Sequence, residues 1–152
     1  MNYKNLFDME LISINVPGAT EEEVFETIAE ELKSKALVEV TYLEGLRTRE
    51  AAFPTGLITQ HLNIALPHTD PEHIVKPFVF IAKLENEVLV KQMGDNQEMK
   101  TKDLFFLGIK DGAGQAGLLA ALMALFMNED FVEAYKTAHT AEAIYHLIVE
   151  HI

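Results

Sequence analysis

Residues 77–109, PFVFIAKLENEVLVKQMGDNQEMKTKDLFFLGI, decide the fold of this chain. The stretch opens with two apolar-rich runs, 77–84 and 87–91, which predict two strands joined in a hairpin through Glu85-Asn86. It closes with the uninterrupted apolar run LFFLGI at 104–109, the pattern of a strand that is covered on both faces. A hairpin in the same sheet as a doubly covered strand predicts a sheet that is mixed rather than all-parallel.

On either side of this stretch the sequence alternates between strand and helix patterns. Thr20 and Glu23 form a capping box in front of apolar residues at helical spacing. Further strands are expected at 11–16 and 63–66, and helices at 20–35, 41–52 and 114–127, from Asp130 and from Thr140 onward. This order predicts an α/β fold in which a mixed β-sheet is flanked by helices. Because no repeat or linker divides the sequence, we expect one domain over 1–152.

Composition excludes several classes of protein. The 49% hydrophobic and 24% charged residues are typical of a globular chain and exclude disorder. The chain has 12 Lys and Arg residues and 24 Asp and Glu residues, which gives a formal net charge of -12. Such a surface would repel nucleic acid and anionic membranes. The absence of cysteine removes disulfides, thiolate metal sites and cysteine nucleophiles.

Membrane insertion and export are not expected. The most apolar run, 118–127 (LLAALMALFM), has about half of the roughly 20 residues that span a bilayer, and it predicts a buried core helix. The first residues lack a basic segment followed by an apolar run and a small-residue cleavage site. These observations predict a cytoplasmic protein.

Three of the six histidines, His61, His68 and His73, lie close together in the sequence. His68 directly follows the predicted strand NIAL and Pro67, so it lies just past a strand end, where α/β folds place their ligand chemistry. Pro67 stiffens the approach because its φ is fixed. A rigid, partly exposed imidazole there suits a nucleophile or a general base. The alternative is a surface-turn histidine without a role.

A metal site is a second interpretation of the same segment. His68, Asp70 and His73 form H-x-D-x-x-H, which supplies three ligands of the kind that zinc hydrolases use. Pro71 constrains the loop between these residues, and no H-E-x-x-H motif accompanies them. We therefore rank a metal-dependent hydrolase low and expect no bound cofactor.

Other residues could hold a phosphoryl group. Arg49 lies in LRTRE at the end of a predicted helix, and arginine clamps phosphate with a planar fork. Thr55-Gly56 adds a hydroxyl, and the small residues 111–114 (DGAG) would leave amides open at a helix N-terminus. A histidine beside such groups suits transient phosphohistidine chemistry. No mononucleotide motif is present, so another protein or a small donor would supply the phosphoryl group.

Two motifs carry a resemblance to a known family. Residues 49–56 (REAAFPTG) and 63–68 (NIALPH) closely resemble the enzyme IIA domains of the bacterial sugar phosphotransferase system (PTS), in their fructose–mannitol class. Together with PH-x-x-x-x-H, they look most like the galactitol-type members. The resemblance covers nearly the whole chain and implies an α/β sandwich with a mixed sheet.

The resemblance also implies a function and its partners. The active histidine maps onto His68, which would accept a phosphoryl group from phospho-HPr and pass it to a partner IIB component. The sugar is then phosphorylated as it enters through the membrane subunit IIC. Arg49 maps onto the arginine that orients the phosphate, and Thr55 is expected to stabilise the phosphoryl group.

The sequence departs from the mannitol-type pattern at one position. Mannitol-type domains carry a second active-site histidine in the segment after the buried strand. This chain has no histidine there, and Gln115 stands about where it would be. Galactitol-type sequences lack the histidine as well. A glutamine amide can donate a hydrogen bond to a phosphoryl oxygen, whereas His73 could supply a second imidazole. Phe53, Leu57 and Ile58 flank the motif and form a candidate docking patch for HPr or IIB, although for Phe53 burial in the core is the stronger expectation.

The leading hypothesis is therefore a phosphohistidine carrier with His68 as its nucleophile. A regulatory IIA paralogue, whose phosphorylation state gates a partner protein, would use the same histidine and remains an alternative. The metal-dependent hydrolase built on His68, Asp70 and His73 is the third hypothesis.

Overall fold

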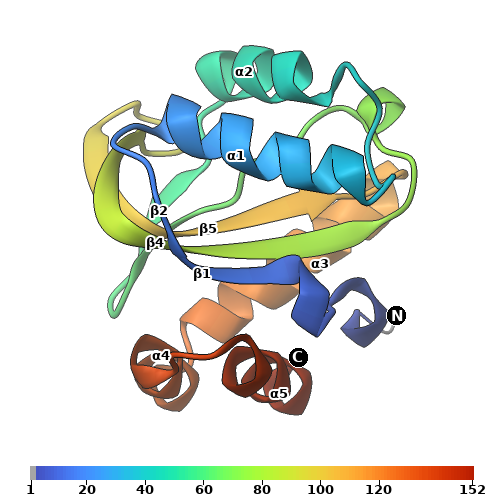
Figure 1. Ribbon diagram of the computed structural model, residues 1–152. Coiled ribbons are helices and arrows are strands. Elements are labelled where there is room, and N and C mark those ends of the chain that lie inside the picture. The colour runs from blue at the N-terminus through green and yellow to red at the C-terminus, as the bar shows by residue number, and fades with distance from the viewer. Residues whose placement is uncertain (1–2) are drawn as a thin grey trace.

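The computed structural model describes residues 3–152, which fold into three layers (Figure 1). A five-stranded sheet of order β1-β4-β5-β3-β2 separates helices α1 and α2 on one face from α3, α4 and α5 on the other. The strands are β1 (Ile12–Val16), β2 (Gly56–Ile58), β3 (Asn63–Ala65), β4 (Phe78–Lys91) and β5 (Glu98–Gly108). The helices are α1 (Glu21–Ser34), α2 (Tyr42–Ala52), α3 (Gly112–Phe126), α4 (Glu129–Thr137) and α5 (Ala141–His151).

The sheet is mixed, as the sequence predicts. β4 and β5 form the central antiparallel pair, β1 joins β4 in parallel and β3 joins β5 in parallel. β2 closes the other edge antiparallel to β3. β2 was not predicted, because a strand of three residues exists only through its pairing with β3, and pairing leaves no periodic signal in so short a segment.

The hairpin turn lies elsewhere than the sequence predicts. β4 is one continuous strand, and the turn to β5 is formed by residues 92–97, closed by a backbone hydrogen bond of 2.7 Å. The expected turn residues Glu85 and Asn86 lie at a bulge in β4, where the pairing register with β5 shifts between Lys83 and Val88. The side chains of Glu85 and Asn86 are exposed, so the strand can hold these polar residues in its middle. In the sequence, two such polar residues look like a turn.

Alternating side chains of the two central strands fill two separate cores. Phe80 of β4 and Phe106 of β5 pack under α1 and α2. Ile81 and Phe105, each one residue along, pack against α3, α4 and α5. The continuous apolar run at 104–109 is thus covered on both faces, which confirms that prediction.

The helix starts follow the expected capping residues with one exception. Thr20 accepts a hydrogen bond from the Glu23 amide, and Thr140 accepts one from the Ala143 amide. The fourth helix starts two residues earlier than expected, because Asn128 rather than Asp130 caps it by accepting from the Phe131 amide.

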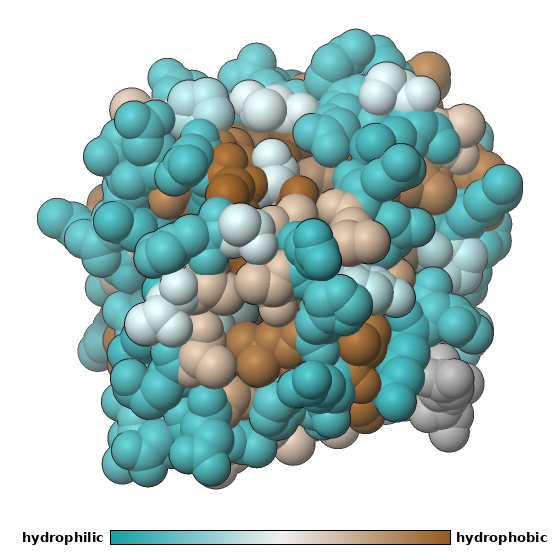
Figure 2. All heavy atoms as spheres, turned by 60° about the horizontal axis from the view of Figure 1, so that its bottom comes forward, coloured by the Kyte–Doolittle hydropathy of each residue, from teal (hydrophilic) through white to brown (hydrophobic). Residues whose placement is uncertain are grey.

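Helix α3 was expected to be buried, but only one of its faces is. Leu118, Leu122 and Phe126 contact the core, whereas Met123 is 45% exposed and Met127, just beyond the helix, is 76% exposed. Figure 2, in which the bottom of Figure 1 comes forward, shows apolar atoms exposed among hydrophilic ones on that face of the molecule. Within residues 3–152 no single helix is long and apolar enough to cross a membrane; α3 and α4 meet that criterion only as a pair bent by 82°.

Candidate functional site

His68 lies three residues beyond the buried end of β3, after Leu66 and Pro67. Its backbone continues alongside β5, where it forms an isolated parallel bridge with Leu107, and the Leu107 amide donates to the Pro67 carbonyl at 2.9 Å. The residue is only 5% exposed, so the expectation of a partly exposed imidazole is wrong: the backbone pairing with β5 and Arg49 cover it. Pro67 restricts the backbone between β3 and His68, so the imidazole is held just beyond the carboxyl end of β3, where the sequence predicts it.

The hydrogen bonds of the imidazole distinguish its two nitrogens. Nδ1 lies 2.8 Å from the Leu66 carbonyl oxygen, which can only accept, so in the neutral ring Nδ1 carries the proton. Nε2 is then unprotonated, and its lone pair accepts a long hydrogen bond from Nη2 of Arg49 at 3.4 Å. The unprotonated nitrogen is thus the one that faces the guanidinium group.

The surroundings of His68 keep the ring neutral. Burial lowers its pKa below the ordinary value of 6.5, and the positive charge of Arg49 lowers it further. The Leu66 carbonyl and the Asp70 carboxylate act in the opposite direction but do not reverse the shift. Nucleophilic attack by imidazole needs the neutral form, which is therefore the one present at neutral pH.

Arg49 reaches His68 from the last turn of α2. Its guanidinium group lies over the Phe53 ring, 4.6 Å from the ring centroid, and its side chain is half-buried. Phe53 itself is 62% exposed, so it supports the arginine from the solvent side instead of joining the core. The arginine is thereby held beside the unprotonated nitrogen with donors to spare.

Glu50, for which the sequence predicted no role in the site, is buried next to the site of His68 and Arg49. Its carboxylate accepts the Thr55 amide at 2.9 Å and the Thr55 hydroxyl at 2.8 Å. The hydroxyl proton of Thr55 is thus used within the protein. Glu50 stands in the quoted motif REAAFPTG, but a glutamate on a helix is ordinarily solvated, and its partner five residues later is fixed only by the turn that follows α2.

The two candidates for a second active-site group lie in different places. His73 lines a cavity of about 490 Å³ that Arg49, Phe53 and Asp70 also line. Its Nδ1 lies 2.7 Å from the Thr41 hydroxyl, and its ring rests against Gly45 of α2. Gln115 lies in the first turn of α3, and within residues 3–152 no hydrogen bond joins its side chain to His68.

The remaining predicted features form no second site. The N-terminus of α3 is capped internally, since Asp111 accepts the Gly114 amide at 2.5 Å. Of the other histidines, His146 lies beside Glu142 at 3.9 Å and His151 packs against Phe131. Throughout the part of the chain that the structure describes, no three His, Asp or Glu side chains are grouped to hold a metal ion, so the three-ligand set of the hydrolase hypothesis is not assembled.

A neutral histidine with one unprotonated nitrogen beside an arginine, at a strand end of a three-layer α/β fold, defines a candidate phosphoryl-carrying domain. Residues 5–151 match the family described as "Phosphoenolpyruvate-dependent sugar phosphotransferase system, EIIA 2". The chain belongs to this family and is a phosphotransferase component of the PTS, which confirms the resemblance seen in the sequence.

Individual relatives agree with this assignment. The chain is 29% identical over 115 residues to the galactitol-specific EIIA component of the PTS from Escherichia coli, covering 76% of this chain and 77% of the relative. Its fold is similar to that of a chain in the structure of the complex of mannitol enzyme IIA and phosphorylated enzyme IIB from Escherichia coli. The TM-score is 0.75 at 18% identity, covering 95% of this chain and 97% of that chain. The fold is also similar to that of the nitrogen regulatory protein IIA-Ntr of Neisseria meningitidis, with a TM-score of 0.74, 19% identity, and coverage of 95% and 97%.

Proposed function

We propose that His68 is the phosphoryl acceptor and that the chain carries the group from phospho-HPr to a IIB component. The observation that carries this proposal is that the two imidazole nitrogens differ. Nδ1 donates to the Leu66 carbonyl, whereas Nε2 is unprotonated and faces Arg49. In the transfer, the Nε2 lone pair forms a bond to phosphorus as the nitrogen–phosphorus bond of phospho-HPr breaks. The HPr imidazole keeps that electron pair, and no proton has to leave His68.

Arg49 would bind the equatorial oxygens of the phosphoryl group. Its guanidinium already lies 3.4 Å from Nε2, so a group bonded to Nε2 comes within its reach. The positive charge that develops on the ring is stabilised by the Leu66 carbonyl at Nδ1. Transfer to IIB is the reverse displacement, with the acceptor side chain attacking phosphorus and His68 as the leaving group.

The other site residues have narrower proposed roles. Thr55 would act by fixing the backbone before β2, because its hydroxyl proton is engaged by Glu50. His73 would supply a second imidazole from the cavity on the Arg49 side, and Gln115 is the alternative donor from α3. The exposed side chains of Phe53 and Ile58, with the partly buried Leu57 of β2, would contribute to the surface that HPr or IIB contacts.

The partners follow from the family and its relatives. A IIB acceptor is supported by the mannitol IIA–IIB complex, and a galactitol-like substrate by the Escherichia coli relative. Uptake through a membrane IIC subunit completes the proposed role, which places this chain in the cytoplasm. The fold of IIA-Ntr keeps the regulatory role as the second candidate, since it would use the same phosphorylated histidine.

Reconstituted phosphoryl transfer tests the proposal directly. Phosphoenolpyruvate, enzyme I, HPr and this protein are incubated together, and the intact mass is read at neutral pH and after acid treatment. One acid-labile phosphoryl group that is absent from His68→Ala and present in His73→Ala is expected. No transfer to a folded protein with active HPr would overturn the carrier function. Addition of the galactitol-type IIB then separates transport from regulation, because only the transport role requires onward transfer.

A further inference from the structure

One buried carboxyl group next to the site has no role in the transfer described above. Glu50 directly follows Arg49 on α2, and the two side chains leave the helix in different directions. Arg49 reaches His68, whereas Glu50 is buried, with 7% of its surface exposed. A carboxyl group is rarely buried without a purpose, because its transfer out of water has to be offset by hydrogen bonds.

Glu50 obtains those bonds entirely from Thr55. The Thr55 amide donates to Oε2 at 2.9 Å and the hydroxyl donates to Oε1 at 2.8 Å. Pro54, the residue before it, has no amide hydrogen, so the Thr55 amide is the first donor of the turn that leads from α2 towards β2. Glu50 therefore fixes the peptide at the point where the chain enters the sheet.

The hydrogen bonds continue from Thr55 to the active imidazole. The Thr55 carbonyl accepts the Leu66 amide at 3.3 Å, and the Leu66 carbonyl in turn accepts from Nδ1 of His68 at 2.8 Å. Thr55 is 2% exposed and Leu66 is completely buried, so water does not compete for these groups. Three consecutive bonds thus connect the Glu50 carboxylate to the nitrogen that sets the tautomer.

We propose that Glu50 is a positioning residue for His68. By holding Thr55, it holds the Leu66 carbonyl where Nδ1 must donate, and this keeps Nε2 unprotonated and turned towards Arg49. The claim about the tautomer concerns the unphosphorylated protein and stands alone, whereas its consequence for phosphoryl transfer rests on the proposed function.

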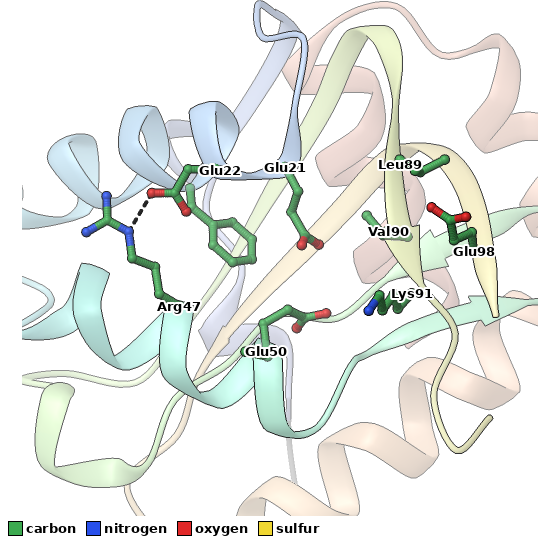
Figure 3. A pocket seen from close by; sticks show the side chains of 10 residues that line it. Glu21, Glu22, Arg47, Glu50, Leu89, Val90, Lys91 and Glu98 are labelled. Carbon is green, nitrogen blue, oxygen red and sulfur yellow. Dashed lines mark hydrogen bonds and ion pairs between the residues drawn. The ribbon is translucent and has the colours of Figure 1, made fainter. Parts of the chain in front are cut away.

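The cavity behind Glu50 contains a second carboxyl group, that of Glu21. Glu21 of α1 and Glu50 of α2 point towards one another in a cavity of about 360 Å³ (Figure 3). Lys91 and Glu98 lie across from them, and Glu22 pairs with Arg47 at the rim. Among residues 3–152, the buried Oε2 of Glu21 has no hydrogen-bond partner, whereas both oxygens of Glu50 accept from Thr55.

The pKa shifts agree with this division. Burial, and then the charge of Glu50, raises the pKa of Glu21 to about 8, so Glu21 is protonated at neutral pH. Burial also raises the pKa of Glu50, but the Thr55 bonds and the Arg49 charge work against that rise. The Thr55 donors thus favour the charged form of Glu50.

The tautomer of His68 can be read by NMR from the nitrogen shifts of ¹⁵N-labelled, unphosphorylated protein. The wild type is expected to show a protonated Nδ1 and a bare Nε2. Glu50→Met fills the same space but accepts no hydrogen bond, so it is expected to show a mixture of both tautomers. Glu50→Gln keeps a carbonyl acceptor for the Thr55 amide and is expected to restore the wild-type pattern. Glu98→Gln, at an exposed position on the rim of the same cavity, is the matched control and should change nothing.

Phosphoryl transfer gives the second readout. The rate of phosphorylation by phospho-HPr is expected to fall by about 10- to 100-fold in Glu50→Met and to stay near wild type in Glu50→Gln. A folded Glu50→Met that keeps the wild-type tautomer would overturn the proposal, and so would a folded Glu50→Gln that loses it. If the wild type accepts no phosphoryl group but the tautomer responds as expected, the proposed function fails and the positioning role survives.

A second variant, Glu50→Asp, is used if Glu50→Met does not fold. If Glu50→Met does not give the wild-type circular dichroism spectrum, Glu50→Asp replaces it, because it keeps the charge but withdraws the carboxylate by one methylene. Both tautomers are then expected in the NMR spectrum. An unchanged tautomer in folded Glu50→Asp, with the Thr55 amide exchanging freely with solvent, would contradict a role for this bond.

Discussion

At the scale of single residues, the site depends on the opposite demands that two neighbours make on one ring. The Leu66 carbonyl requires a proton on Nδ1, whereas the Arg49 guanidinium discourages a second proton on Nε2. A histidine without these contacts would exchange between two tautomers and would be partly protonated near pH 6.5. The two contacts together leave one neutral form with one available lone pair.

Replacement of Arg49 is expected to raise the pKa of His68. Arg49→Gln removes the positive charge that lowers this pKa, while burial continues to lower it, so the ring should titrate closer to its ordinary value of 6.5. The NMR titration of the His68 ring measures the shift. Arg47→Gln, on the same helix but paired with Glu22, is the control and should leave the titration unchanged. An equal pKa in Arg49→Gln and wild type would show that the arginine does not act on the ring.

Glu21 gives the protein a stability that falls as the pH rises. Its pKa is about 8 in the folded protein against an ordinary value of 4.5, so between these values the folded state holds a proton that the unfolded chain has released. The free energy of unfolding attributable to Glu21 therefore decreases by about 1.4 kcal/mol per pH unit across this window, and below it the penalty vanishes. The remaining charges around the cavity, from Glu22, Arg47 and Lys91 among others, are the same in wild type and variant.

Glu21→Gln is expected to remove most of that decrease. Urea unfolding of wild type and variant at pH 5, 7 and 9 measures the difference, which should be small at pH 5 and should reach several kcal/mol in favour of the variant at pH 9. Glu98→Gln is again the control. Parallel pH profiles for wild type and Glu21→Gln would mean that Glu21 is ionised and solvated in the folded protein.

At the scale of elements, close cross-strand packing decides where β4 and β5 meet. Gly108 lies opposite Phe78 at the end of the ladder, and a Cβ on Gly108 would clash with the Phe78 ring. The ring thus lies directly over the glycine backbone. The pair anchors β5 just before the chain turns into the capped start of α3.

Gly108→Ala is therefore expected to destabilise the protein by about 1–3 kcal/mol, because the Phe78 ring must leave its position. Urea unfolding measures the loss. Gly112→Ala is the matched control, since a Cβ there would meet nothing within 4 Å. In the double variant with Phe78→Leu, the cost of the added methyl group should shrink, and full additivity would show that the ring is not what it meets.

The sequence predicted those elements whose signal is local. Capping at Thr20 and Thr140, the helical repeat of α1 and the doubly covered run in β5 all lie within a few neighbouring residues. β2 and the true hairpin turn escaped prediction because each is determined by which residues of two successive strands pair, and the pairing register leaves no periodic signal in the sequence. The exposed face of α3 escaped for a related reason, since an apolar sequence does not specify which side meets the sheet.

The same distinction holds for the candidate site. The sequence indicated His68 and Arg49, which the structure brings to 3.4 Å, because their residue types carry the chemistry. Glu50 stands in the quoted motif, yet its function depends on three hydrogen bonds that pass through the backbone of Thr55 and Leu66. No residue type signals a backbone relay, so only the folded chain reveals it.

At the scale of the whole molecule, the sheet couples two cores that share no helix. β4 and β5 contribute alternate residues to both cores, so neither core can lose its packing while the sheet remains intact. Hydrogen bonds also join α4 to both central strands, because the Tyr135 hydroxyl donates to Asp103 of β5 at 2.8 Å and Lys83 of β4 donates to the Tyr135 carbonyl at 2.7 Å. The protein should therefore unfold as one cooperative unit.

Two buried tyrosines make this cooperativity measurable. The chain has no tryptophan, Tyr42 lies in the core under α1 and α2, and Tyr135 lies in the core against α3 to α5. With 3-fluorotyrosine incorporated, the ¹⁹F signals of both residues should lose their native positions at the same urea concentration. Phe105→Ala, which empties space only in the Tyr135 core, should lower that concentration equally for both signals, at a cost of about 3–5 kcal/mol. A variant in which Tyr135 unfolds before Tyr42 would show instead that the site layer, with α2 and His68, can persist without the helices beneath it.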